Sequence, residues 1–139
     1  MIMHARTEEP MAMQLRDKLK QAKELVPSIA PLDAVSRLGR DDVVFVDVRD
    51  LHELTKDGTI PGSVHVSRGA LEFAIDPKSP AHKKPLSREV TFIVFCASGM
   101  RSLLAGQTML EMGVKNVMSL EGGYTGWRKE GGPSTTASV

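Results

Sequence analysis

Two short, almost wholly apolar runs constrain the fold of this chain more than any other feature of its sequence. They cover residues 43–48 and 90–95, and each contains a single polar residue. A strand with one face in water alternates apolar and polar residues, so these runs predict strands that are covered on both faces. Helix-like patterns separate the runs. Short apolar strands that alternate with helices predict an α/β fold with a mainly parallel sheet.

The remaining pattern supplies helices and strands on either side of these runs. Asp50 and Glu53 have the spacing of a capping box at a helix start, and Gly122 and Gly123 form a turn that leads to Trp127. We expect Trp127 to cover the core, because its large apolar surface is worth burying. We expect helices over residues 11–26, 31–39, 50–58, 71–75 and 102–112, and further strands over 64–66 and 114–120.

A chain of 139 residues fits one domain of ordinary size. We divide it into an N-terminal extension (1–27), a central domain (28–133) and a tail (134–139) that we expect to be disordered from its composition. The extension places apolar residues at helical spacing, which predicts an amphipathic helix that docks on its own domain or on another subunit. These residues are Met11, Leu15, Leu19, Ala22 and Val26.

Composition and charge narrow the classes of function. The net charge of +1 argues against a dominant role on nucleic acid or on a membrane surface. One cysteine excludes an intramolecular disulfide framework and a cysteine-rich zinc site, and the four scattered histidines suggest no metal site. No segment reaches the roughly 20 apolar residues that span a bilayer. We expect a cytoplasmic protein, where a free thiol stays reduced.

That single cysteine, Cys96, directly follows the apolar run 90–95 and precedes a helical pattern. A thiol between a strand and a helix start lies among unpaired backbone N–H groups at the positive end of the helix dipole. Such surroundings favour the thiolate, which is the reactive species. The alternative is a buried and inert cysteine, the common fate of a free thiol. The Ser98 and Gly99 that follow favour the reactive interpretation, because an inert cysteine needs no such loop.

Four sequence blocks, taken together, resemble the single-domain members of the rhodanese-like sulfurtransferase family over about residues 28–133. The blocks are Asp47-Val48-Arg49-Asp50, Gly58-Thr59-Ile60-Pro61-Gly62-Ser63, Cys96-Ala97-Ser98-Gly99-Met100-Arg101-Ser102, and Leu120-Glu121-Gly122-Gly123 with Trp127 and Gly132-Pro133. Each block alone is weak, but their order and spacing are specific. The resemblance implies a central, mainly parallel five-stranded sheet flanked by helices, to which this chain adds its N-terminal helix.

The resemblance also implies an enzyme of the thiosulfate sulfurtransferase type. Its Cys96 would carry sulfur as a persulfide, taken from a small donor such as thiosulfate and given to cyanide or a thiol, without metal or organic cofactor. A cradle of backbone N–H groups would face the sulfur, and Arg101 would add a positive charge. Arg68 is a further candidate for substrate binding, if its turn approaches the loop. The expected binding residues of the loop are Ala97, Ser98, Gly99, Met100, Arg101 and Ser102.

The sequence differs from some relatives at three positions, and these differences leave alternative functions open. Two-domain relatives that use thiosulfate well have arginine where this chain has Glu53, and basic residues where it has Ala97 and Ser98. The alternative is therefore a persulfide-carrying interaction module that a protein donor feeds. Related phosphatases place five residues between cysteine and arginine, whereas this chain places four, which disfavours phosphatase or arsenate reductase activity. We interpret Asp47 and Arg49 as a structural ion pair.

Overall fold

The computed structural model describes residues 12–137 of the chain and contains one five-stranded sheet. The strand order is β1-β5-β4-β2-β3, and all four neighbouring pairs run parallel. The central strand β4 (Thr91–Phe95) pairs with β2 (Val43–Asp47) on one side and β5 (Val117–Leu120) on the other. The outer strands β1 (Ser28–Ile29) and β3 (Val64–His65) are short. The predicted α/β fold with a five-stranded parallel sheet is confirmed.

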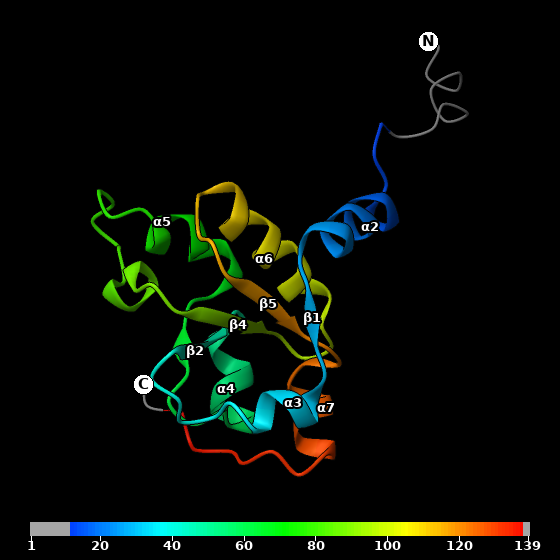
Figure 1. Cartoon of the computed structure of the whole chain (residues 1–139), viewed down its shortest axis with the longest axis vertical. Helices are drawn as coiled ribbons and strands as arrows, with labels where there is room; N and C mark the ends of the chain where they lie inside the picture. Colours follow the sequence, from blue (N-terminus) through cyan, green and yellow to red (C-terminus); the bar gives the residue numbers. More distant parts are fainter. Residues whose placement is uncertain (1–11, 138–139) are drawn as a thin grey trace.

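Helices cover both faces of this sheet (Figure 1). One face carries α3 (Pro31–Val35), α4 (Leu51–Asp57) and α7 (Gly123–Lys129), and the other carries α2 (Leu15–Leu25), α5 (Leu71–Ile75) and α6 (Met100–Glu111). Two 3₁₀ turns, η1 (Arg68–Ala70) and η2 (Lys84–Ser87), join the elements around α5. None of the helices within residues 12–137 has the length and apolar character needed to cross a membrane.

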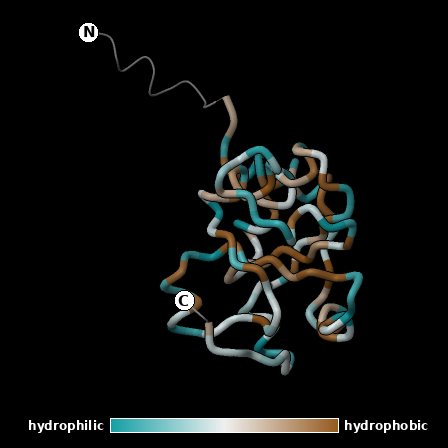
Figure 2. Tube along the Cα trace, turned by 90° about the vertical axis from the view of Figure 1, so that its left-hand side faces the viewer, coloured by the Kyte–Doolittle hydropathy of each residue, from teal (hydrophilic) through white to brown (hydrophobic). Residues whose placement is uncertain are grey.

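The two faces bury separate hydrophobic clusters, which is why strands β2 and β4 read as continuous apolar runs. Phe92 and Val94 point into the cluster beneath α5 and α6, whereas Ile93 and Phe95 point into the cluster beneath α3 and α7. Figure 2 shows the resulting hydrophobic band along the central strands. Trp127 is fully buried in the second cluster and donates its indole N–H to the Pro133 carbonyl at 2.8 Å. Its predicted place in the core is confirmed.

The N-terminal helix α2 docks on α6 of its own domain. Ala22 and Val26 are buried, whereas Leu15 remains 64% exposed. Val26 fits against Gly106 so closely that a Cβ there would lie 2.9 Å from Val26 Cγ1. The sequence left open whether this helix docks on its own domain or on another subunit, and the structure shows it on its own domain. Met11 and the residues before it lie outside the described residues 12–137.

The chain after Pro133 is fastened to the domain, which differs from the disorder expected over 134–139. Thr135 forms an isolated antiparallel bridge with Thr59, with both N···O distances at 2.9 Å. The Tyr124 hydroxyl donates to the Asp57 carbonyl at 2.9 Å and lies 2.6 Å from Ser134 Oγ. Backbone pairing therefore orders polar residues that composition alone assigns to a disordered tail. Residues 138 and 139 lie outside the described residues.

Candidate active site

Cys96 follows the last residue of β4 and lies at the carboxyl edge of the sheet, near its middle. Its side chain is 1% exposed. The two peptide groups that follow Cys96 are fixed by α7, because Tyr124 N donates to the Cys96 carbonyl at 2.7 Å and Thr125 N donates to the Ala97 carbonyl at 3.1 Å. A Cβ at position 123 would lie 2.5 Å from both carbonyl oxygens, so only Gly123 allows this approach. The carboxyl edge of a parallel sheet is where ligands bind in such folds.

The sulfur of Cys96 has two polar neighbours. Gly99 N donates to Sγ at 3.1 Å, and the thiol lies 3.6 Å from the hydroxyl oxygen of Ser102. Gly99 adopts φ +111°, a left-handed conformation that favours glycine and turns its N–H back toward the sulfur. Of the expected cradle, this is the one backbone N–H that the structure bonds to the sulfur among residues 12–137. The binding role of the other loop residues stays a prediction.

A chain of buried hydroxyls continues from the sulfur into β5. Ser102 Oγ lies 2.8 Å from Ser119 Oγ and donates to the Gly99 carbonyl at 3.1 Å. Ser102 and Ser119 are both at most 2% exposed, so these hydroxyls are shielded from bulk solvent. Sequence reasoning missed Ser119, and no local signal marks it beyond its place near the end of an expected strand.

The helix α6 starts at Met100, two residues earlier than expected, and this brings Arg101 into its first turn. The Arg101 guanidinium is held by Glu53 of α4 through two hydrogen bonds, Nη1 to Oε2 and Nη2 to Oε1, both 2.9 Å long. The Arg101 side chain is 39% exposed and that of Glu53 21%. Glu53 also accepts a hydrogen bond from Asp50 N at 2.8 Å, which completes the predicted capping box.

This ion pair shifts both titrations away from neutral pH. The hydrogen bonds from Arg101 lower the pKa of Glu53 to about 2, and the Asp50 N–H and the charge of Arg101 act in the same direction against partial burial. Glu53 in turn raises the pKa of Arg101, with smaller contributions from Cys96 and Asp50. Glu53 is therefore ionised under physiological conditions, and Arg101 lies close enough to the sulfur for their charges to interact.

The predicted structural pair of Asp47 and Arg49 is confirmed. Arg49 donates from Nε and Nη2 to the two carboxylate oxygens at 3.0 and 2.8 Å, and both side chains are at most 1% exposed. Thr59 Oγ1 and Arg49 N also donate to this carboxylate, at 2.7 and 3.0 Å. The guanidinium lies 4.3 Å from the ring centroid of Tyr124. The hydrogen bonds of this pair thus go to protein groups other than the sulfur.

Within residues 12–137, the Arg68 side chain forms no hydrogen bond with the Cys96 loop, so its role in substrate binding stays a prediction. Its guanidinium donates to Glu72 Oε1 and to Thr108 Oγ1, each at 3.0 Å. Thr108 lies eight residues beyond the start of α6 at Met100, about 12 Å along the helix axis at 1.5 Å per residue. The sequence placed Arg68 in a turn but could not show which part of α6 that turn approaches.

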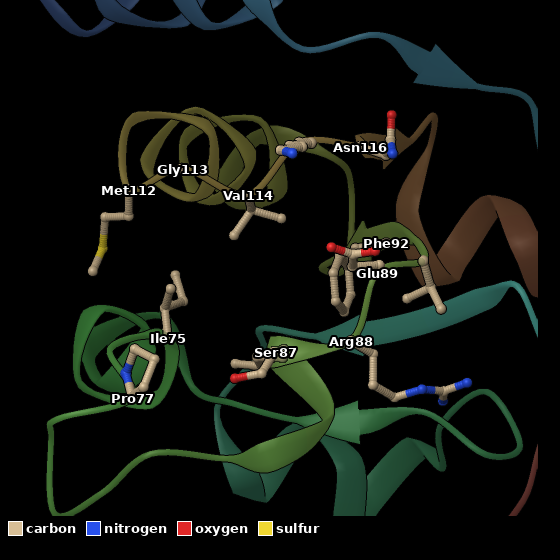
Figure 3. A pocket seen from close by; sticks show the side chains of 13 residues that line it. Ile75, Pro77, Ser87, Arg88, Glu89, Phe92, Met112, Gly113, Val114 and Asn116 are labelled. Carbon is tan, nitrogen blue, oxygen red and sulfur yellow. The ribbon is translucent and has the colours of Figure 1, made fainter.

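A cavity of about 610 Å³ lies at the opposite edge of the sheet (Figure 3). It is lined by residues before and at the start of β4, such as Val90 and Phe92, and by the turn before β5, such as Val114. None of its lining residues belongs to the site expected from the sequence. Within residues 12–137, no group of three His, Cys, Asp or Glu side chains is placed to hold a metal ion.

Comparison with known proteins yields a family match for most of the chain. The model of the rhodanese-like domain matches residues 30–130. The thiosulfate sulfurtransferase GlpE of Pseudoalteromonas translucida is 32% identical over 90 residues, which cover 65% of this chain and 77% of that protein.

Solved structures share the same architecture. A Rhodopseudomonas palustris protein of unknown function, described as a possible tyrosine phosphatase, is 40% identical with a TM-score of 0.87, covering 91% of this chain and 98% of that one. The polysulfide-sulfur transferase homodimer of Wolinella succinogenes is 34% identical with a TM-score of 0.64, covering 87% of this chain and 86% of that one.

Proposed function

The chain belongs to the family of rhodanese-like domains, and its relatives include a thiosulfate sulfurtransferase. We propose that the chain transfers sulfane sulfur through a persulfide on Cys96. The observation that carries this proposal is the position of the sulfur. Cys96 lies where the central strand ends, with the Gly99 N–H directed at Sγ from 3.1 Å. A donor N–H at this distance stabilises the negative charge of the Cys96 thiolate, both when it attacks a donor and when it is released again as the leaving group of the persulfide.

The proposed reaction has two half-reactions. In the first, the Cys96 thiolate attacks the outer sulfur of a donor such as thiosulfate, an S–S bond forms, and the old S–S bond breaks with its electron pair leaving on sulfite. In the second, an acceptor such as cyanide or a thiolate attacks the outer persulfide sulfur and releases the Cys96 thiolate. This is covalent catalysis in two steps, and it needs neither metal nor organic cofactor.

The alternative donor is a protein. The residues between Cys96 and Arg101 are uncharged, and Arg101 is already bound to Glu53. A small dianion therefore finds little free positive charge, which favours a persulfide-carrying module that receives sulfur from a cysteine desulfurase. Turnover with thiosulfate and cyanide, compared with sulfur transfer from a desulfurase loaded with cysteine, separates the two donors.

Phosphatase activity is the competing chemistry suggested by the description of the Rhodopseudomonas palustris protein. Here four residues separate Cys96 from Arg101, and the guanidinium faces Glu53. A phosphate would need a wider ring of N–H donors and a free arginine fork. We therefore expect no hydrolysis of p-nitrophenyl phosphate above the level of a Cys96→Ser variant.

Intact-mass spectrometry of the purified protein tests the proposed function. Incubation with thiosulfate should add one sulfur atom, and dithiothreitol should remove it. Cys96→Ser should show neither the adduct nor turnover, because a hydroxyl at neutral pH is a far poorer nucleophile than a thiolate. Circular dichroism of that variant controls for folding. An adduct that survives in folded Cys96→Ser would refute the assignment of the sulfur carrier.

A further inference from the structure

A sulfur donor that reaches the Cys96 thiolate has to pass the charged groups around it. Arg101 lies in the first turn of the helix that follows the Cys96 loop, and its guanidinium is occupied by Glu53 through two 2.9 Å bonds. Asp50 also lies close enough to raise the pKa of Arg101. The Glu53 carboxylate thus occupies the guanidinium of the loop that follows a sulfur which itself becomes negative.

Other cations at this edge of the sheet do not restore a positive site. Arg49 is buried against Asp47, and Arg68 is bound to Glu72. The Lys83 ammonium donates to the His65 carbonyl at 2.7 Å, at the end of β3. Strand β3 is two positions from β4 in the sheet, so its backbone runs roughly 10 Å from the strand that leads into Cys96.

We propose that Glu53 sets the donor preference of this site, by neutralising Arg101 so that singly charged or uncharged organic donors of sulfane sulfur are used in preference to dianionic ones. Glu53 acts through Arg101 and is therefore a positioning residue. The inference rests on the proposed sulfur transfer to Cys96 and names the class of donor for it.

Two donors that differ by one charge at the same sulfur isolate this effect. Thiosulfate is a dianion that leaves sulfite, and methanethiosulfonate is a monoanion that leaves methanesulfinate. In both cases the Cys96 thiolate forms a bond to the outer sulfur, and the electron pair of the broken S–S bond departs with the leaving group. The second-order rate constants for formation of the Cys96 persulfide, followed by intact mass, give a selectivity ratio for each variant.

We expect the wild-type protein to prefer methanethiosulfonate. Glu53→Gln keeps the helix cap, since glutamine serves equally at that position of a capping box, but it frees the charge of Arg101. We expect this variant to shift the ratio toward thiosulfate on the order of fivefold or more, the size expected for one nearby charge in a partly solvated site. Glu53→Asp retains the carboxylate and should leave the ratio close to the wild-type value.

Asp42→Asn is the matched control. Asp42 also holds an arginine, Arg40, by two hydrogen bonds of 2.8 and 2.9 Å, but it precedes β2 and so lies at the far edge of the sheet. It changes the net charge by the same amount and should leave the ratio unchanged. Added salt should accelerate the thiosulfate reaction of the wild-type protein and do so less for Glu53→Gln, because screening relieves the same repulsion.

Equal selectivity ratios in the wild-type protein and Glu53→Gln, with both donors loading Cys96, would overturn this inference and leave the proposed function standing. An equal shift in Asp42→Asn would also overturn it, because net charge and not Glu53 would then set the preference. Failure of both donors to load Cys96 would overturn the proposed function and this inference with it.

Discussion

Arg49 and Arg101 are each held by two parallel hydrogen bonds to a carboxylate at the same edge of the sheet, but in different surroundings. The Arg49 and Asp47 side chains are buried, and Thr59 and Tyr124 complete their contacts. The Arg101 pair is partly exposed and lies beside the sulfur. The same geometry therefore serves two ends: a buried pair must stay intact for the domain to fold, whereas a partly exposed pair can be altered and so can tune chemistry.

Breaking the buried pair should have the largest effect on stability. Asp47→Asn leaves the buried Arg49 charge without a counterion, and we expect it to lower the free energy of unfolding by about 3–5 kcal/mol. Urea denaturation followed by circular dichroism measures the loss. A loss below about 1 kcal/mol would mean that the guanidinium finds water or another partner, and that the two pairs do not differ in the way proposed.

Removing Arg101 from its partly exposed pair with Glu53 should lower the rate of sulfur uptake more than the stability of the fold. We expect Arg101→Ala to slow sulfur uptake by Cys96 about tenfold, equivalent to about 1.4 kcal/mol in the activation free energy, because Glu53 loses its counterion and its negative charge then opposes the thiolate and an anionic donor. Its stability should fall by no more than about 1 kcal/mol. Single-turnover mass measurements give the rate and urea denaturation gives the stability. A larger loss of stability than of rate would contradict the division between the two pairs.

Lowering the pH should remove the contribution of Glu53 to the stability of the fold. Because its pKa is lowered from 4.5 to about 2 in the folded protein, the pair stabilises the fold above the ordinary pKa of glutamate. That contribution is lost as the pH falls from about 4.5 toward 2. We expect the stability difference between the wild-type protein and Glu53→Gln to be about 1 kcal/mol at pH 7, since the pair is partly exposed. A difference that stays constant from pH 7 to pH 2 would contradict the lowered pKa.

The smallest effect should come from the surface pair of Arg68 and Glu72. Their side chains are 33% and 48% exposed and lie four residues apart along the chain. We expect Glu72→Gln to change the free energy of unfolding by less than about 0.5 kcal/mol. Thermal denaturation of Glu72→Gln and Asp47→Asn under the same conditions compares the two effects. A change in the free energy of unfolding as large as that of Asp47→Asn would show that exposure does not determine how much each ion pair contributes to stability.

The sequence predicts those parts of the site that depend on neighbours along the chain. Cys96 at a strand end, the Glu53 cap and the Asp47 pair all follow from local spacing, and the structure has each of them. The bond between Glu53 and Arg101 joins residues 48 positions apart, so no local pattern indicates it.

Short elements were likewise beyond local patterns. The strand β1 has two residues and therefore no period to recognise. The helix α7 begins at Gly123 after a left-handed Gly122, residues that indicate a turn more strongly than a helix. Composition also predicts disorder for Ser134 and Thr135, because it does not show their partners, Tyr124 ten residues earlier and Thr59 on the other side of the sheet strands β4 and β5 in the sequence.

The contact between Val26 and Gly106 extends the segment that belongs with the sulfur site beyond the part that matches the family. The family match begins at residue 30, yet the methyl groups of Val26 occupy a notch in the very helix whose first turn carries Arg101. Grafting the matched segment alone into another protein would leave that notch open to water. We expect a transplant that includes α2, from Leu15 onward, to keep this contact, which the matched segment alone lacks.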